Sequence, residues 1–222
     1  MSLVAHWQFD GALTDAGGGG RTLLSSGTTT FSSSDKVGSH AAVFGGTNYL
    51  YYPSDAALQT SAGSVVFWVN PSSFADYPLL AGCHAAATRP GWAIYIAPSG
   101  QVGVQCYTAT FAAVDFVASL PMSTGQWHQI ALTWAGTAAG DAVKLYQNLV
   151  LVGSANASAN WSIPAQPISF GDSAVDSFWG GSAAAAFVGF MDDVRYFNRV
   201  VTLDDLAQLP GHNIAWPSIV PV

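Results

Sequence analysis

The sequence has few charged residues and no glutamate. Only 9% of its 222 residues are charged, and all thirteen acidic residues are aspartate, whereas about a quarter of the residues in a typical soluble domain are charged. Six lysines and arginines leave a net charge of −7, which cannot supply the cationic patch that nucleic acids require. Nucleic acids and anionic membranes are therefore unexpected partners. A surface so poor in charge suits permanent packing against protein neighbours.

Long apolar runs are also absent. No stretch approaches the roughly 20 apolar residues of a transmembrane helix, so the sequence predicts no membrane insertion. Residues 1–7 contain no basic segment followed by a sustained apolar run, and thus no signal peptide is expected.

Cysteine is scarce, with one residue in each of two predicted strands. Residues 79–85, 91–97 and 101–107 form three consecutive strands of a predicted meander, which places Cys83 and Cys106 on its outer strands. Two strand spacings of about 4.8 Å each exceed the reach of a disulfide. We expect two free thiols.

Alternation of apolar and polar residues dominates the rest of the chain, and half of all residues are hydrophobic. In residues 3–10, for example, Leu3, Ala5, Trp7 and Phe9 share one face, as expected of a half-buried strand. About a dozen such runs, separated by Gly, Pro, Asn, Asp and Ser, predict an all-β protein built as a two-sheet antiparallel sandwich. The other runs are 41–44, 49–52, 65–70, 112–119, 128–134, 143–147, 150–154, 167–170 and 187–197.

One short C-terminal helix is predicted after these strands. Thr202 and Asp205 have the spacing of a capping box, and leucines recur at helical spacing until Pro210 ends the helix. We therefore predict one domain over residues 1–209 and an extended, proline-rich tail over 210–222. The tail is too apolar to remain solvated, so it is expected to dock on its own sandwich or on a neighbouring subunit.

Seven segments follow one another in a distinctive order: Trp7–Gly11, Val43–Gly46 with Tyr49–Leu50, Val65–Pro71, Trp127–Trp134, Val143–Tyr146, Ile168–Gly171 and Phe187–Arg199. In this order they resemble the laminin-G-like and concanavalin A-like jelly rolls. The resemblance implies the same jelly-roll fold over roughly residues 4–209. One departure is Asn148-Leu149, where related domains carry Asp-Gly in a hairpin; Leu is a poor residue at positive φ, so a different loop is expected.

Catalysis is not expected. The glycoside hydrolases that the chain resembles carry a Glu-x-Asp-x-x-Glu motif, and a chain without glutamate cannot form it. Asp192 and Asp193 are adjacent on a predicted strand, so their side chains should point to opposite faces.

Calcium is the ion that the resemblance implies. Similar jelly rolls hold a structural Ca²⁺ with an aspartate on the last strand, which corresponds to Asp192, while Asp10, Asp15 or nearby carbonyls could assist. Alternatively, Asp192 accepts backbone amides or pairs with Arg195 or Arg199.

Exposed aromatic rings are the expected ligand contacts, because sugar rings stack on them. Trp7, Trp68, Trp127 and Trp134 lie in predicted structural strands and are assigned to the core. The candidates in loops or near strand ends are Tyr77, Trp92, Tyr107, Trp161, Phe178 and Trp179.

Two functions fit these features. The first is a non-catalytic structural protein displayed on an assembly, such as a phage capsid decoration or fibre protein, with possible glycan adhesion. The second is a carbohydrate-binding, lectin-like module of a secreted or cell-surface protein. Both place the protein on a virion surface or outside the cell, with protein neighbours, glycans or further copies of itself as partners.

Overall fold

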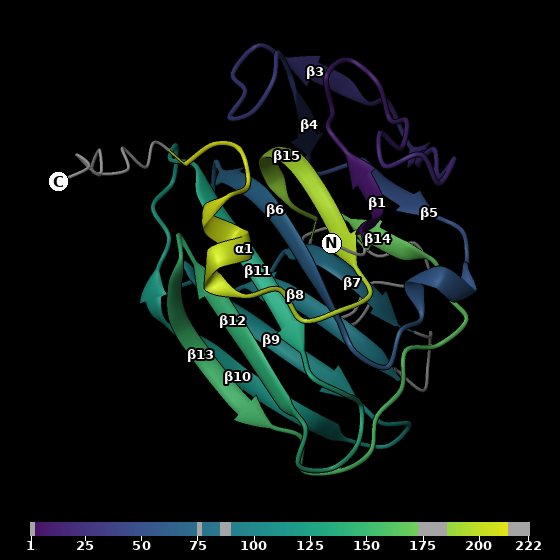
Figure 1. Cartoon of the computed structure of the whole chain (residues 1–222). Coiled ribbons are helices and arrows are strands. Elements are labelled where there is room, and N and C mark those ends of the chain that lie inside the picture. Colours follow the sequence, from purple (N-terminus) through teal and green to yellow (C-terminus); the bar gives the residue numbers. More distant parts are fainter. Residues whose placement is uncertain (1–2, 75–76, 85–89, 173–185, 213–222) are drawn as a thin grey trace, which may run out of the picture.

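The computed structural model describes residues 3–74, 77–84, 90–172 and 186–212. These residues form two antiparallel β-sheets that face each other, with one short helix outside the sandwich (Figure 1). The predicted all-β, two-sheet architecture is confirmed. No helix in these residues is long and apolar enough to cross a membrane.

Sheet A contains eight strands. Seven of them lie in the order β13-β12-β11-β6-β15-β4-β3, and β1 pairs with β15 beside this path. Their bounds are β1 (Leu3–Trp7), β3 (Thr30–Ser32), β4 (Ala41–Gly45), β6 (Gly63–Pro71), β11 (His128–Trp134), β12 (Ala142–Gln147), β13 (Val150–Asn156) and β15 (Val188–Phe197).

Sheet B contains seven strands in the order β10-β9-β8-β7-β14-β5-β2. Some neighbouring strands, such as β7 and β14, are distant in sequence. The chain reaches them by crossover connections, as in a jelly roll. The bounds are β2 (Leu24–Ser26), β5 (Tyr49–Tyr52), β7 (Leu79–His84), β8 (Gly91–Ile96), β9 (Gln101–Tyr107), β10 (Ala112–Pro121) and β14 (Ile168–Phe170); a 3-10 turn spans Ala56–Leu58.

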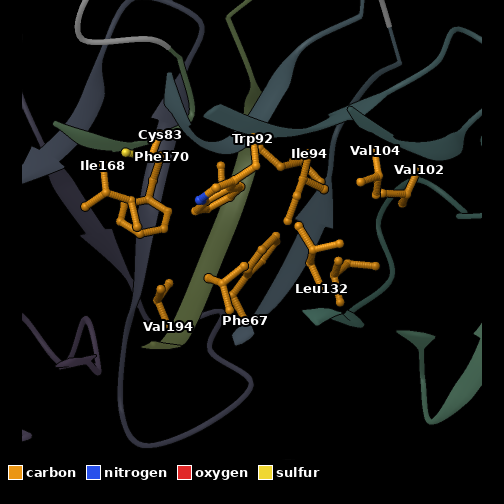
Figure 2. Close-up of a cluster of buried hydrophobic side chains, with 14 of the residues drawn as sticks. Phe67, Cys83, Trp92, Ile94, Val102, Val104, Leu132, Ile168, Phe170 and Val194 are labelled. Atoms are coloured by element: carbon orange, nitrogen blue, oxygen red, sulfur yellow. The ribbon is translucent and has the colours of Figure 1, made fainter. Parts of the chain in front are cut away.

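The core fills the space between the sheets with alternate residues of each strand. Trp92 and Ile94 of sheet B point toward Phe67 and Leu132 of sheet A (Figure 2). Trp92 also stacks on Trp134 with ring centroids 5.9 Å apart. This apolar burial is the main source of stability.

The two cysteines lie on β7 and β9, with β8 between them. Cys83 is directly opposite Trp92, and Trp92 is directly opposite Cys106. Both thiols are buried and free, as predicted, and burial raises the pKa of Cys83 to about 12.

Helix α1 (Leu203–Ala207) packs on the outer face of sheet A (Figure 1). Its capping box is confirmed. Thr202 Oγ1 accepts a hydrogen bond from the Asp205 amide, and the Asp205 carboxylate accepts one from the Thr202 amide. Arg199 donates two hydrogen bonds to the same carboxylate, at 2.7 and 2.9 Å. Leu206 anchors the helix in a second apolar cluster.

The Asn148-Leu149 loop is a two-residue turn, so the expectation of a different loop is wrong. Gln147 pairs directly with Val150, and Asn148 and Leu149 have φ angles of +51° and +68°. Leu149 packs against the cluster beneath α1. Packing therefore holds a leucine in a conformation that it rarely adopts.

The first three residues after position 209 dock on their own sandwich. The Trp68 indole nitrogen donates to the Pro210 carbonyl at 3.2 Å, and the His212 ring lies 4.9 Å from the indole. Lys36 Nζ lies 4.7 Å from the centre of the same ring. Residues 213–222 lie outside the described residues, and the boundary between domain and tail stays a prediction.

Candidate functional site

The outer face of sheet B, on the side away from the core, carries one aligned row of residues. Each residue of the row is directly opposite the next on the neighbouring strand, so all of them share this face. At its centre, Ser169, Gly82 and Ala93 are small and buried, and Ser169 and Ala93 are 3% and 0% exposed. The row is Leu24, Tyr51, Ser169, Gly82, Ala93, Gln105 and Asp115.

Tyrosines flank this row on both sides. Tyr95 lies with its ring across Gly103, where any side chain would collide with the ring. Tyr77 lies 5.9 Å from Tyr95 and is 45% exposed. On the other side of the row, Tyr107 is partly exposed and packs against Ala93. Tyr95 is only 4% exposed, so the accessible aromatic surface of this face comes from Tyr77 and part of Tyr107.

A hydrogen-bonded chain crosses one end of the face. The Tyr107 hydroxyl donates to Gln105 Oε1 at 3.1 Å, and Gln105 Nε2 donates to Asp115 Oδ2 at 3.2 Å. Gln105 is buried and Asp115 is exposed, so the amide orients a carboxylate that solvent can reach. Burial, with the Asp115 charge nearby, raises the pKa of Tyr95 to about 12.

The structure sorts the predicted aromatic contacts into three groups. Tyr77 and Tyr107 lie on the outer face of sheet B. Trp92 and Trp161 are 0% and 4% exposed within the core, so the prediction that they present a ring to a ligand is wrong. Trp92 was chosen because it lies near the end of a strand. Its side chain nevertheless points into the core, on the same face of β8 as Ile94. Phe178 and Trp179 lie outside the described residues.

Sequence reasoning missed Tyr95, Gln105 and Asp115. The signal was present, because Gln105 alternates with the buried Val104 and Cys106 and therefore shares a face with Tyr107. Proximity to loops was the wrong criterion for choosing aromatic residues.

Asp192, the predicted calcium ligand, is fully buried on the outer side of sheet A. Its Oδ2 accepts the Lys36 and Val37 amides at 2.9 and 2.8 Å, so the amide-capping alternative is confirmed. Its Oδ1 has no hydrogen-bond partner among the described residues. Burial raises the pKa of Asp192 to about 7.

The two predicted helper carboxylates are already engaged by the protein. Asp10 accepts the Ser39 and His40 amides; burial opposes its ionisation, but these hydrogen bonds outweigh burial and lower its pKa. Asp15 accepts the His6 amide at 2.9 Å.

Asp15 is the poorer cation ligand of the two helpers, because its Oδ2 lies 4.0 Å from the Arg21 guanidinium. In the described part of the chain, no three His, Cys or Asp side chains cluster to hold a metal.

A β-bulge overturns the expected orientation of Asp192 and Asp193. The register between β15 and β6 shifts after Asp192, and Asp193 has a φ of +49°. Asp193 then binds His6 at 2.6 Å and Arg195 at 2.9 Å, on the same side of the sheet as Asp192. Because a bulge inserts an extra residue, strict alternation does not apply here. Asp193, rather than Asp192, pairs with Arg195.

Comparison with known proteins identifies related domains. The family model described as "Concanavalin A-like lectin/glucanases superfamily" matches residues 44–207. No curated protein sequence matches significantly.

Many solved structures share the fold, among them the following three. Domain 4 of the extracellular arabinanase AbnA from Geobacillus stearothermophilus, in complex with arabinotriose, has 22% identity and a TM-score of 0.68, covering 92% of this chain and 96% of that one. The binding domain of Paraclostridial Mosquitocidal Protein 1 has 14% identity and a TM-score of 0.74, covering 92% and 51%. Botulinum neurotoxin type C, whose cell entry depends on two ganglioside molecules, has 12% identity and a TM-score of 0.63, covering 92% and 50%. This chain spans about half the length of the two toxin chains.

Proposed function

The chain belongs to the concanavalin A-like lectin/glucanase superfamily, and we propose that it is a non-catalytic glycan-binding module. The ligand binds on the outer face of sheet B. Tyr77, which is exposed, and Tyr107, which is partly exposed, stack on sugar rings, and the exposed Asp115 at the end of the face binds sugar hydroxyls. A similar domain in complex with arabinotriose, and a similar toxin chain whose cell entry depends on two ganglioside molecules, support this class of ligand.

The observation that carries the proposal is the Tyr107–Gln105–Asp115 hydrogen-bonded chain. A carboxylate that accepts a hydrogen bond from a buried amide is held in one orientation, and it still has lone pairs for further donors. A sugar hydroxyl is such a donor. Aromatic surface beside oriented polar groups is the usual composition of a small-ligand site.

A non-catalytic role agrees with the carboxylates of the described residues. The chain has no glutamate, Asp115 lies at the end of the face, and Asp193 is engaged by His6 and Arg195. Binding without hydrolysis is the function of a module that delivers or anchors a larger protein to a glycan surface outside the cell.

Binding to a panel of neutral oligosaccharides that includes arabinotriose tests this function. We expect saturable binding that Tyr107→Ala and Asp115→Asn abolish or weaken at least tenfold, which corresponds to about 1.4 kcal/mol. Trp127→Ala is the matched control. The assignment of Trp127 to the core is wrong, because Trp127 is a partly exposed aromatic residue that pairs with Phe190 of sheet A. A ligand whose affinity all three variants leave unchanged would contradict the assignment of the face.

The predicted contacts Phe178 and Trp179 stay predictions. Trp179→Ala in the same panel tests them. Lost binding in this variant would extend the site to that segment, and unchanged binding would remove it.

A structural Ca²⁺ at Asp192 is a second part of the proposal. Asp192 fits such an ion because a buried carboxylate oxygen without a hydrogen-bond partner is costly, and Ca²⁺ prefers oxygen ligands. The ion would neutralise this carboxylate and tie the 36–40 loop to the last strand. A melting temperature that rises with CaCl₂, falls again with EGTA and does not respond in Asp192→Asn would support it. No response in the wild type would remove it.

The virion-decoration hypothesis stays a prediction. It depended on sparse charge and on the tail, of which only residues 210–212 are described. Loss of particle binding on deletion of residues 213–222 would favour it over the glycan module.

A further inference from the structure

A second surface lies on the outer face of sheet A, on the opposite side of the sandwich from the proposed glycan face. It is a shallow depression of about 400 Å³ between β12 and the start of α1. Its lining comes from two segments distant in sequence, Lys144 and Tyr146 on one side and Val200–Asp204 on the other.

Exposed apolar side chains surround this depression. Val200 is 38% exposed and Leu203 is 46% exposed. Leu151, 47% exposed, lies on β13 directly opposite Tyr146 and therefore on the same face. Together with Lys144 and Asp204 these residues form what we call the α1 patch. Contiguous exposed apolar surface of this kind marks an interaction site.

The α1 patch also carries two opposite charges that do not pair with each other. Lys144 and Asp204 are both exposed, and neither forms an ion pair within the described part of the chain. The arginines in the described part of the chain differ from Lys144 in this respect. Arg21, Arg195 and Arg199 each pair with an aspartate. Lys144 is therefore an available cation on a chain of net charge −7.

We infer that the α1 patch is the interface of a two-fold symmetric homodimer. In such an interface, if one residue contacts a second residue of the partner, the second contacts the first in return. One positive and one negative residue at opposite sides of a depression satisfy this rule, because each Lys144 then meets the Asp204 of the other copy. The apolar residues between them pack against their own counterparts.

The dimer would make glycan binding bivalent. Association through sheet A does not involve the proposed glycan site on sheet B of either copy, and two linked sites bind a multivalent surface more tightly than one. This consequence depends on the proposed function, but the dimer itself does not.

Sedimentation velocity of wild-type protein and charge-reversal variants tests the inference. We expect a wild-type dimer, whereas Lys144→Glu and Asp204→Lys are each monomeric because both contacts become like-charged. An equimolar mixture of the two variants should dimerise again. In the mixed dimer, the introduced glutamate of one copy faces the introduced lysine of the other, and the native Lys144 and Asp204 form the second contact. Asp35→Lys makes the same charge change as Asp204→Lys but lies outside the patch, so this variant should remain dimeric.

A matched apolar pair covers the case in which a charge variant fails to fold. Leu203→Gln should dissociate the dimer and Leu24→Gln should not, because both leucines are 46% exposed and only Leu203 lies in the patch. A monomeric wild type, a dimer that resists these substitutions, or a variant mixture that stays monomeric would overturn the inference. So would Leu203→Gln weakening glycan binding without changing sedimentation, which would make the depression a ligand site instead.

Discussion

Replacing Trp92 distinguishes a core residue from a ligand contact. The ring is fully buried and stacks on Trp134, so Trp92→Ala leaves a large cavity and should cost about 3–5 kcal/mol. For a chain of this size each kcal/mol shifts the melting temperature by about 2–4 °C, which gives a fall of roughly 6–20 °C.

Trp92→Phe should cost much less. The indole N–H has no hydrogen-bond partner among the described residues, and an unsatisfied buried donor costs about 1–3 kcal/mol. Phenylalanine removes that donor and fills most of the cavity, so a loss below about 2 kcal/mol is expected. Urea unfolding measures both changes, and glycan affinity of the folded Trp92→Phe protein should be unchanged. A Trp92→Ala variant that loses less than about 1 kcal/mol, or a Trp92→Phe variant that keeps its stability but loses affinity, would refute the core assignment.

Three further predictions concern the thiols, the helix cap and the hairpin. Cys83 and Cys106 should react with a thiol reagent only after unfolding, since both are buried and the pKa of Cys83 is about 12; rapid labelling of the folded protein would contradict this. Arg199 holds the pKa of Asp205 well below its ordinary value of about 4, so the ion pair stabilises the protein above that pH and the effect is lost as pH falls. The deficit of Asp205→Asn, about 1 kcal/mol near neutrality, should therefore shrink in acid unfolding curves, and a constant deficit would count against the pair. Leu149→Gly relieves about 1 kcal/mol of backbone strain but loses packing beneath α1, so urea unfolding should show a net loss of stability; a gain would mean that the strain is the larger effect.

Sequence periodicity predicted most of the sandwich. The runs at 79–85, 91–97 and 101–107 correspond to β7, β8 and β9, and the capping box of α1 was also visible. The strands β2 and β3 were missed because three residues in a stretch rich in Ser, Thr and Gly show no alternation. They form by pairing with β5 and β4, a tertiary effect that local sequence does not reveal.

The candidate site was less predictable than the fold. Trp92 alternates with Ala93 and shares the inward face of β8 with Ile94, but the choice of ligand contacts used size and closeness to loops instead of this alternation. The aligned row on sheet B depends on register across seven strands, which a single sequence does not contain. The bulge at Asp193 likewise follows from pairing with β6 rather than from local residue preference.

Calorimetric titration with a neutral oligosaccharide identified on the panel, arabinotriose first, tests the central claim most directly. The account predicts saturable binding by the wild type and by Trp127→Ala, with at least tenfold weaker binding by Tyr107→Ala and Asp115→Asn, or about 1.4 kcal/mol. Absence of binding to every neutral glycan, or equal affinity in all four proteins, would contradict the assignment of the sheet B face as a glycan-binding surface.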